Sequence, residues 1–191
     1  MTRITQLAEL ISIVGHPFVT ITLLVATLAM RQRHGHGGAQ PIFLVVVLVI
    51  VPVGMLMFWQ VRRGRWSNAD ASNAPERPVL FLVALSGVLT SIGWLLLKHP
   101  ESFMIHGMLV IAAFLCLAAL LTRWIKLSLH VAFAALAATV LCLIGSWVGY
   151  TLVAVVPSLF WSRLILSRHS IRELAVGLVL GVLAGFAMVQ M

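Results

Sequence analysis

Long runs of apolar residues, separated by short polar segments, repeat along the whole chain. The runs cover about residues 17–30, 41–61, 79–97, 103–122, 131–147, 150–161 and 170–188. Several approach the ~20 residues that carry a helix across a bilayer, whereas 131–147 and 150–161 are short for a full crossing. The pattern predicts an all-α fold, a polytopic transmembrane helical bundle with about six to seven spans.

The first residues show a different pattern. Apolar positions at Ile4, Leu7 and Val14 alternate in helical spacing with polar ones such as Arg3 and Glu9. This amphipathic pattern predicts that residues 1–15 form a helix on the membrane interface. The chain then turns into the membrane at the His16-Pro17 pair, where His16 is a candidate for the substrate entrance.

Composition agrees with a membrane protein, because 61% of the 191 residues are hydrophobic and 9% are charged. The polar loops are too short to fold alone, so we expect one integral-membrane domain over residues 1–191. A net charge of +8 would suggest nucleic acid in a soluble protein. In a membrane protein it indicates anionic headgroups or an anionic substrate, and we expect no nucleic-acid partner. Cys116 and Cys142 lie inside apolar runs and are interpreted as packing residues.

The last run carries a row of small residues, Gly177, Gly181 and Gly185. Glycines at this spacing share one face of a helix and let a second helix approach closely in lipid. Packing within the chain is the favoured interpretation, and a homodimer through this row is the alternative.

Three polar segments, 62–78, 123–130 and 162–173, are each separated from the next by two spans, so all three emerge on the same side. A shared site is therefore possible in this topology. The polar residues that they offer are Asp70, Ser72, Asn73, Glu76 and Arg77, then Lys126, Ser128 and His130, then Arg163, His169 and Glu173.

The third segment suggests a chemistry. Glu173 follows His169 by four residues, so on a helix it reaches the imidazole and can hold one ring nitrogen as N–H. The other nitrogen is then available as a nucleophile or base. Arg163 offers a planar fork of donors suited to phosphate oxygens. Few carboxylates and no thiols accompany the histidines, so we expect neither a metal nor another cofactor.

The third segment resembles a signature motif of the type 2 phosphatidic acid phosphatases, the PAP2 superfamily, which also includes vanadium haloperoxidases. That motif reads SR-x5-H-x3-D. The chain matches it with Ser162, Arg163, His169 and Glu173, the last in place of the aspartate.

The other two segments resemble the family's remaining motifs. LSLH at 127–130 is similar to PSGH, with Ser128 and His130 kept and Leu129 in place of glycine. The K-x6-RP motif is kept at Arg77-Pro78, but Asp70 stands where the family has lysine. DASNAPERP and WIKLSLH also look like the D-x-S-x3-ER and W-x-K-x-S-x-H motifs of a divergent integral-membrane branch. The resemblance covers about residues 62–190, the motif-bearing core.

The resemblance implies that His169 is a nucleophile forming a phosphohistidine, oriented by Glu173, with His130 as general acid. It implies phosphate binding by Arg77, Lys126, Ser128 and Arg163, with Asp70, Ser72 and Glu76 in supporting positions. It also implies a PAP2-like bundle.

The function expected is that of a metal-independent membrane lipid phosphatase. The candidate substrates are isoprenoid diphosphates, phosphatidic acid and phosphatidylglycerophosphate. A lipid phosphotransferase with the same intermediate and a non-catalytic lipid-binding or transport protein are the alternatives.

The distribution of charge suggests which way the chain faces. Ten of the 13 lysines and arginines fall on the motif side: Arg3, Arg62, Arg63, Arg65, Arg77, Arg123, Lys126, Arg163, Arg168 and Arg172. The positive-inside rule then favours a plasma or inner membrane with the site facing the cytoplasm.

Overall fold

The computed structural model describes residues 2–31, 40–66, 74–100, 102 and 104–190. Over these ranges the chain is helical and contains no strand, which confirms the predicted all-α class. The chain divides into two compact units, described separately below. Unit 1 comprises Met1–Arg31 and Ile125–Met191, and unit 2 comprises Gln32–Trp124.

Within the described residues, six helical stretches are long and apolar enough to cross a membrane. They are Arg3–Arg31, Phe43–Arg62, Arg77–Lys98, Met104–Leu121, Trp147–Ile165 and Ile171–Val189. A shorter apolar helix covers Leu129–Leu143. The protein is therefore an integral, multi-pass membrane protein built as a helical bundle.

One span was predicted to be shorter than the helix in the structure. The sixth run was expected to end near residue 161, but the helix covers Trp147–Ile165 and continues through Ser162 and Arg163. Polar residues end an apolar run in the sequence, yet both side chains are buried against another helix, so the helix need not stop there. The helix before it is short, as expected, but its 15 residues cover Leu129–Leu143 and end before the predicted end near Trp147, which instead begins the next helix.

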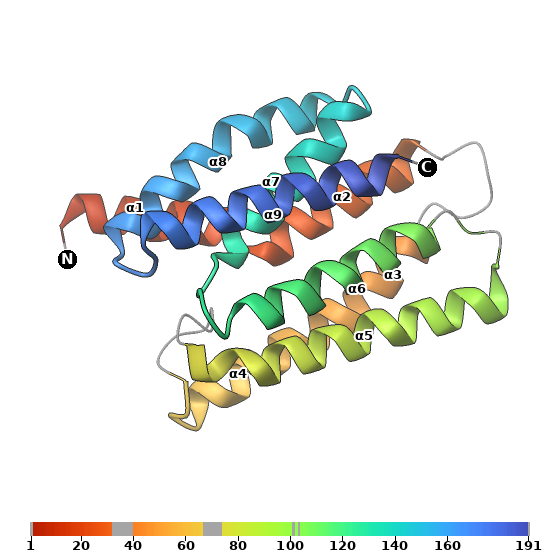
Figure 1. The fold of residues 1–191 in the computed structure, drawn as a ribbon, viewed down its shortest axis with the longest axis horizontal. Coiled ribbons are helices and arrows are strands. Elements are labelled where there is room, and N and C mark those ends of the chain that lie inside the picture. The colour runs from red at the N-terminus through yellow and green to blue at the C-terminus, as the bar shows by residue number, and fades with distance from the viewer. Residues whose placement is uncertain (1, 32–39, 67–73, 101, 103, 191) are drawn as a thin grey trace. The chain divides into compact units, whose positions relative to one another are not determined.

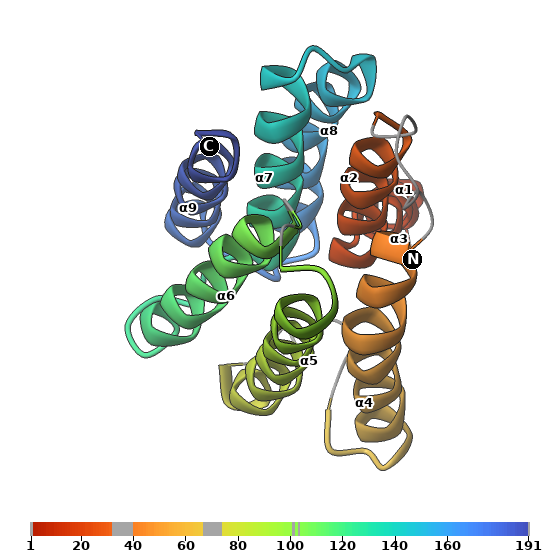
Figure 2. The same ribbon diagram turned by 90° about the vertical axis from the view of Figure 1, so that its right-hand side faces the viewer.

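Unit 1 is organised around one buried helix. Its helices are α1 (Arg3–Val14), α2 (Pro17–Arg31), α7 (Leu129–Leu143), α8 (Trp147–Ile165) and α9 (Ile171–Val189). Helix α7 packs against α2, α8 and α9, while α1 packs against α8 (Figures 1 and 2). Most of α7 is apolar or alanine on every side, as expected of a helix surrounded by others.

The glycine row of α9 lies against α7. A side chain at Gly177 would come within 2.7 Å of the Ser128 carbonyl oxygen, and one at Gly181 would meet the carbonyl of Ala132. A side chain at Gly185 would likewise clash with Thr139. The row therefore serves packing within the chain, the interpretation favoured from the sequence, and it brings the start of α9 onto the start of α7.

Unit 2 is organised around α5. It contains α3 (Gln40–Val45), a π-helical segment (Val46–Ile50), α4 (Val51–Arg62), a 3-10 turn (Ala74–Glu76), α5 (Arg77–Lys98) and α6 (Met104–Leu121). Pro52 has no N–H, so the Leu48 carbonyl cannot receive the usual helical hydrogen bond from it. That carbonyl lies against Gly87 of α5, where any side chain would clash.

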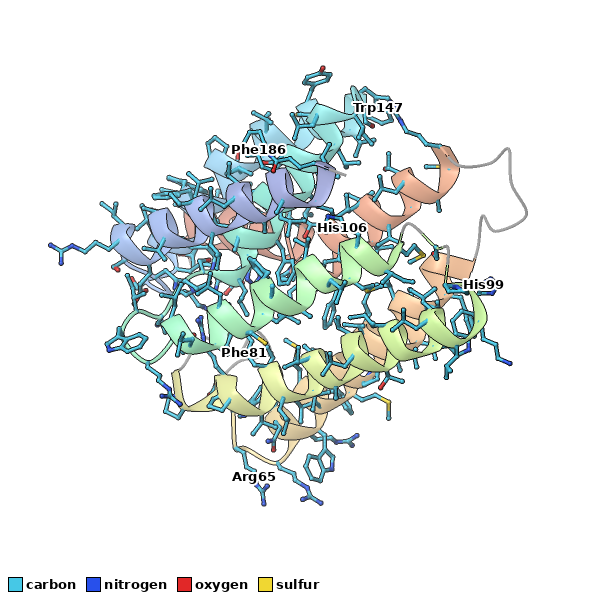
Figure 3. The ribbon with its side chains drawn as sticks, turned by 45° about the vertical axis from the view of Figure 1, so that its right-hand side comes forward. Arg65, Phe81, His99, His106, Trp147 and Phe186 are labelled. Carbon is cyan, nitrogen blue, oxygen red and sulfur yellow. The ribbon has the colours of Figure 1, made fainter. Side chains whose placement is uncertain are left out.

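The end of α4 combines arginines with aromatic rings. The Arg63 guanidinium carbon lies 3.7 Å from the centroid of the Trp59 ring, and that of Arg62 lies 5.6 Å from the Phe58 ring centroid. Figure 3 shows Arg65 at this end of unit 2 and His99 at the far end of α5. Stacked cations and tryptophan are typical of a membrane interface with anionic headgroups.

Candidate functional site

The second and third polar segments meet at one end of unit 1. Figure 1 shows the start of α7 and the turn from α8 to α9 at this end, and two hydrogen bonds join them. The backbone N–H of Ser128 donates to the Glu173 carbonyl at 3.2 Å. The Lys126 carbonyl accepts from the His169 ring at 3.1 Å. These bonds fix two motif-bearing segments that lie about 40 residues apart in the sequence.

The turn from α8 to α9 explains the spacing between Arg163 and His169. The Arg168 N–H donates to the Arg163 carbonyl at 3.1 Å, and the Ser167 N–H donates to the Leu164 carbonyl at 2.9 Å. These two bonds form a Schellman motif, which reverses the chain at a left-handed residue. That residue is Ser167, with φ 52°. His169 follows two residues later, so the helix end sets its position relative to Arg163.

His169 is held by two acceptors on a single ring nitrogen. Its Nδ1 lies 3.1 Å from the Lys126 carbonyl oxygen and 3.1 Å from Glu173 Oε2. Neither a carbonyl nor a carboxylate can donate, so Nδ1 carries the proton. In the neutral ring, Nε2 then carries the lone pair, as a nucleophile requires.

Glu173 is itself held in place by the start of α9. Its Oε2 accepts from the Ser170 N–H at 3.0 Å, and its own N–H donates to Ser170 Oγ at 3.4 Å. This is a capping box, which satisfies two N–H groups at the start of the helix. One carboxylate thus caps α9 and orients His169, as the spacing predicted.

Ser128 precedes α7 as its N-cap residue, but its side chain makes no capping hydrogen bond. The residue is 0% exposed, and its Oγ has no hydrogen-bond partner among the described residues. A buried hydroxyl in this condition carries a free-energy cost unless another group binds it. Because its backbone N–H binds Glu173, which also contacts His169, Ser128 is a candidate donor for a ligand oxygen.

Arg163 and Ser162 bind helix α1. The Nη1 of Arg163 donates to Ser12 Oγ at 2.7 Å, and Ser162 Oγ donates to the Ala8 carbonyl at 2.6 Å. Arg163 is 1% exposed, so its charge is held in a buried, polar setting rather than in a solvated loop. Ser12 and Ala8 lie outside the three polar segments.

His130 lies in the first turn of α7 and is buried. Its ring meets the His16 ring edge to face, with centroids 5.1 Å apart and planes at 88°. His16 is at the corner between α1 and α2, so the same N-terminal segment contacts Arg163 and His130.

The structure therefore brings four of the predicted site residues together: His169, Glu173, Lys126 and Ser128. Two others contact the N-terminal segment, Arg163 through α1 and His130 through the corner between α1 and α2. Lys126 contributes its carbonyl, while phosphate binding by its side chain stays a prediction. Arg77 and Glu76 belong to unit 2, where both are buried at the start of α5. Asp70 and Ser72 lie outside the described residues.

Sequence reasoning missed Ser12 and gave His16 only a place at the entrance. A signal was present, because Ala8, Ser12 and Gly15 share one face of the amphipathic segment. Small residues on one face indicate close helix packing in a membrane. In the described part of the chain, no three His, Cys, Asp or Glu residues gather as a metal-binding group.

Comparison of the chain with family models, curated proteins and solved structures gives no match. The resemblance to the PAP2 superfamily therefore rests on the motif residues themselves, and the function has to be argued from the site.

Proposed function

We propose that the protein is a metal-independent membrane phosphatase that hydrolyses a lipid phosphate or diphosphate through a phosphohistidine at His169. The observation that carries this proposal is the double hydrogen bond on His169 Nδ1. It leaves Nε2 as the basic nitrogen, at a position fixed by two elements of the fold. Since the protein lies in the membrane, a lipid-anchored substrate can reach the site from the bilayer.

The reaction proceeds in two steps. His169 Nε2 attacks phosphorus, the bond from phosphorus to the leaving oxygen breaks, and His130 gives that oxygen a proton. The oxygen of a water molecule then attacks the phosphorus of the phosphohistidine, and the bond from phosphorus to His169 Nε2 breaks. The water's proton passes to His130, and inorganic phosphate leaves. Arg163 neutralises phosphoryl oxygens and Ser128 donates a hydrogen bond to one of them. Additional phosphate binding by Arg77 and Lys126 remains a prediction from the sequence.

The test is phosphate release by detergent-purified protein from phosphatidic acid, phosphatidylglycerophosphate and an isoprenoid diphosphate, with a chelator present. We expect His169→Ala to lower the rate at least about 1,000-fold. His99→Ala, in unit 2, is the matched control and should retain wild-type activity. Trapping of a labelled, acid-labile phosphohistidine in wild type but not in His169→Ala would identify the nucleophile directly.

Three results would overturn the proposal. Phosphate release that appears only when an acceptor lipid or sugar is added would identify a phosphotransferase with the same intermediate. No release under either condition, from protein that remains folded, would indicate a lipid-binding or transport role. Wild-type activity in His169→Ala would remove this residue from the mechanism.

We further propose that the site faces the cytoplasm across a plasma or inner membrane, since the motif side carries most of the positive charge. Arg172 is exposed beside the site and offers a position for labelling. In a background with Cys116 and Cys142 replaced by serine, Arg172→Cys should react with a membrane-impermeant thiol reagent only after the cells are opened. Reaction in intact cells would place the site on the outer face.

A further inference from the structure

The corner between α1 and α2 lies outside the 62–190 stretch that resembles the phosphatase motifs. Its residues nevertheless contact two of the proposed site residues, through Ser12 on Arg163 and His16 on His130. The corner packs closely against α8, because a side chain at Gly15 would clash with Leu159 of that helix. The position of His16 is therefore fixed by packing.

The protonation of His16 follows from its role at the start of α2. Its carbonyl accepts from Val19 at 2.9 Å and Thr20 at 3.1 Å, which makes it the N-cap residue. Its Nδ1 accepts from the Phe18 N–H at 3.2 Å. A ring nitrogen that accepts cannot carry a proton, so neutral His16 holds its proton on Nε2.

Two contacts fix the His16 ring. The N–H of Phe18 binds its Nδ1, and the edge-to-face contact places the ring against that of His130, with centroids 5.1 Å apart.

We propose that His16 is a positioning residue for His130. It sets the orientation of the His130 ring by the edge-to-face contact. His130 gives a proton to the leaving oxygen as that oxygen departs from phosphorus, and regains one from water during hydrolysis. His16 itself exchanges no proton. This inference rests on the proposed function.

The test uses the dependence on the leaving group. A general acid matters for a poor leaving group, such as the alkoxide of dodecyl phosphate, and little for p-nitrophenyl phosphate. His16→Asn keeps an oxygen that can accept from Phe18 but loses the ring. We expect its rate on dodecyl phosphate to fall about 10- to 100-fold, with less than a threefold change on p-nitrophenyl phosphate. His99→Asn serves as the control and should alter neither rate.

A double-mutant cycle separates positioning through His130 from an independent effect. We expect His16→Asn combined with His130→Ala to be no slower on dodecyl phosphate than His130→Ala alone. Losses that multiply, or equal losses on both substrates, would overturn the inference while leaving the phosphatase proposal intact.

A spectroscopic measurement tests the inference without activity. Nitrogen NMR of the wild-type protein labelled at histidine should show His16 with an unprotonated Nδ1, and His16→Asn should shift the ring signals of His130. A protonated Nδ1 on His16, or unchanged His130 signals, would overturn the inference. If wild type releases phosphate from none of the three lipids of the first test, the proposed function fails, and the NMR result still decides whether His16 orients His130.

Discussion

The two ends of α8 adopt related turns with different consequences. At the α7–α8 end, the Gly145 N–H donates to the Cys142 carbonyl and the Ser146 N–H to the Leu141 carbonyl, each at 2.8 Å. The α8–α9 end has the same Schellman arrangement around Ser167. The left-handed residue is glycine in the first turn, with φ 71°, and serine in the second, with φ 52°.

The surroundings of the two turns differ as well. Around Gly145 there is open space, since nothing lies within 4 Å of where a side chain would begin. The α8–α9 turn instead follows buried Arg163 and leads directly to buried His169. A non-glycine residue in the left-handed region costs about 1–2 kcal/mol. The α7–α8 turn is therefore a plain connection, whereas the α8–α9 turn tolerates backbone strain where it positions polar groups.

The largest expected effect comes from removing the buried cation of the α8–α9 end. Arg163→Gln should lower phosphate release about 100- to 1,000-fold, because a donor to the phosphoryl oxygens is lost. Arg172→Gln removes an equal charge from an exposed position nearby and should stay within about twofold of wild type. Steady-state rates on one lipid phosphate measure both, and an equal loss in the two variants would contradict a specific role for Arg163.

An exchange of the two left-handed residues tests the backbone comparison directly. Ser167→Gly should raise the free energy of unfolding by about 0.5–1 kcal/mol, and Gly145→Ser should lower it by a similar amount. Thermal melting of detergent-solubilised protein, followed by circular dichroism, gives the sign. Destabilisation by Ser167→Gly would show that serine is not strained in this turn.

A further expected effect concerns the N-cap serines of the two helices that follow these turns. Ser170 Oγ accepts from the Glu173 N–H, whereas Ser146 makes no side-chain capping bond. Ser170→Ala should therefore cost about 1 kcal/mol of stability, and Ser146→Ala only a few tenths. The same melting experiment compares them. Equal losses would mean that the capping box does not stabilise α9.

Features that depend on apolar length and on local spacing were predictable from the sequence. The runs of apolar residues predicted the helical class and most helix bounds, because burying backbone groups in lipid requires helices. The spacing of His169 and Glu173 predicted their contact, because residues four apart share a helix face. The glycine row likewise predicted a close helix contact.

The contacts between distant groups depend on tertiary packing. The tertiary structure continued α8 through Ser162 and Arg163, since groups on α1 bind their side chains. It joined His169 to the Lys126 carbonyl and set His16 against His130. Local patterns say little about these contacts, because each depends on how separate helices pack and on which buried polar groups must find partners there. The small-residue face of α1 was the one trace of them in the sequence.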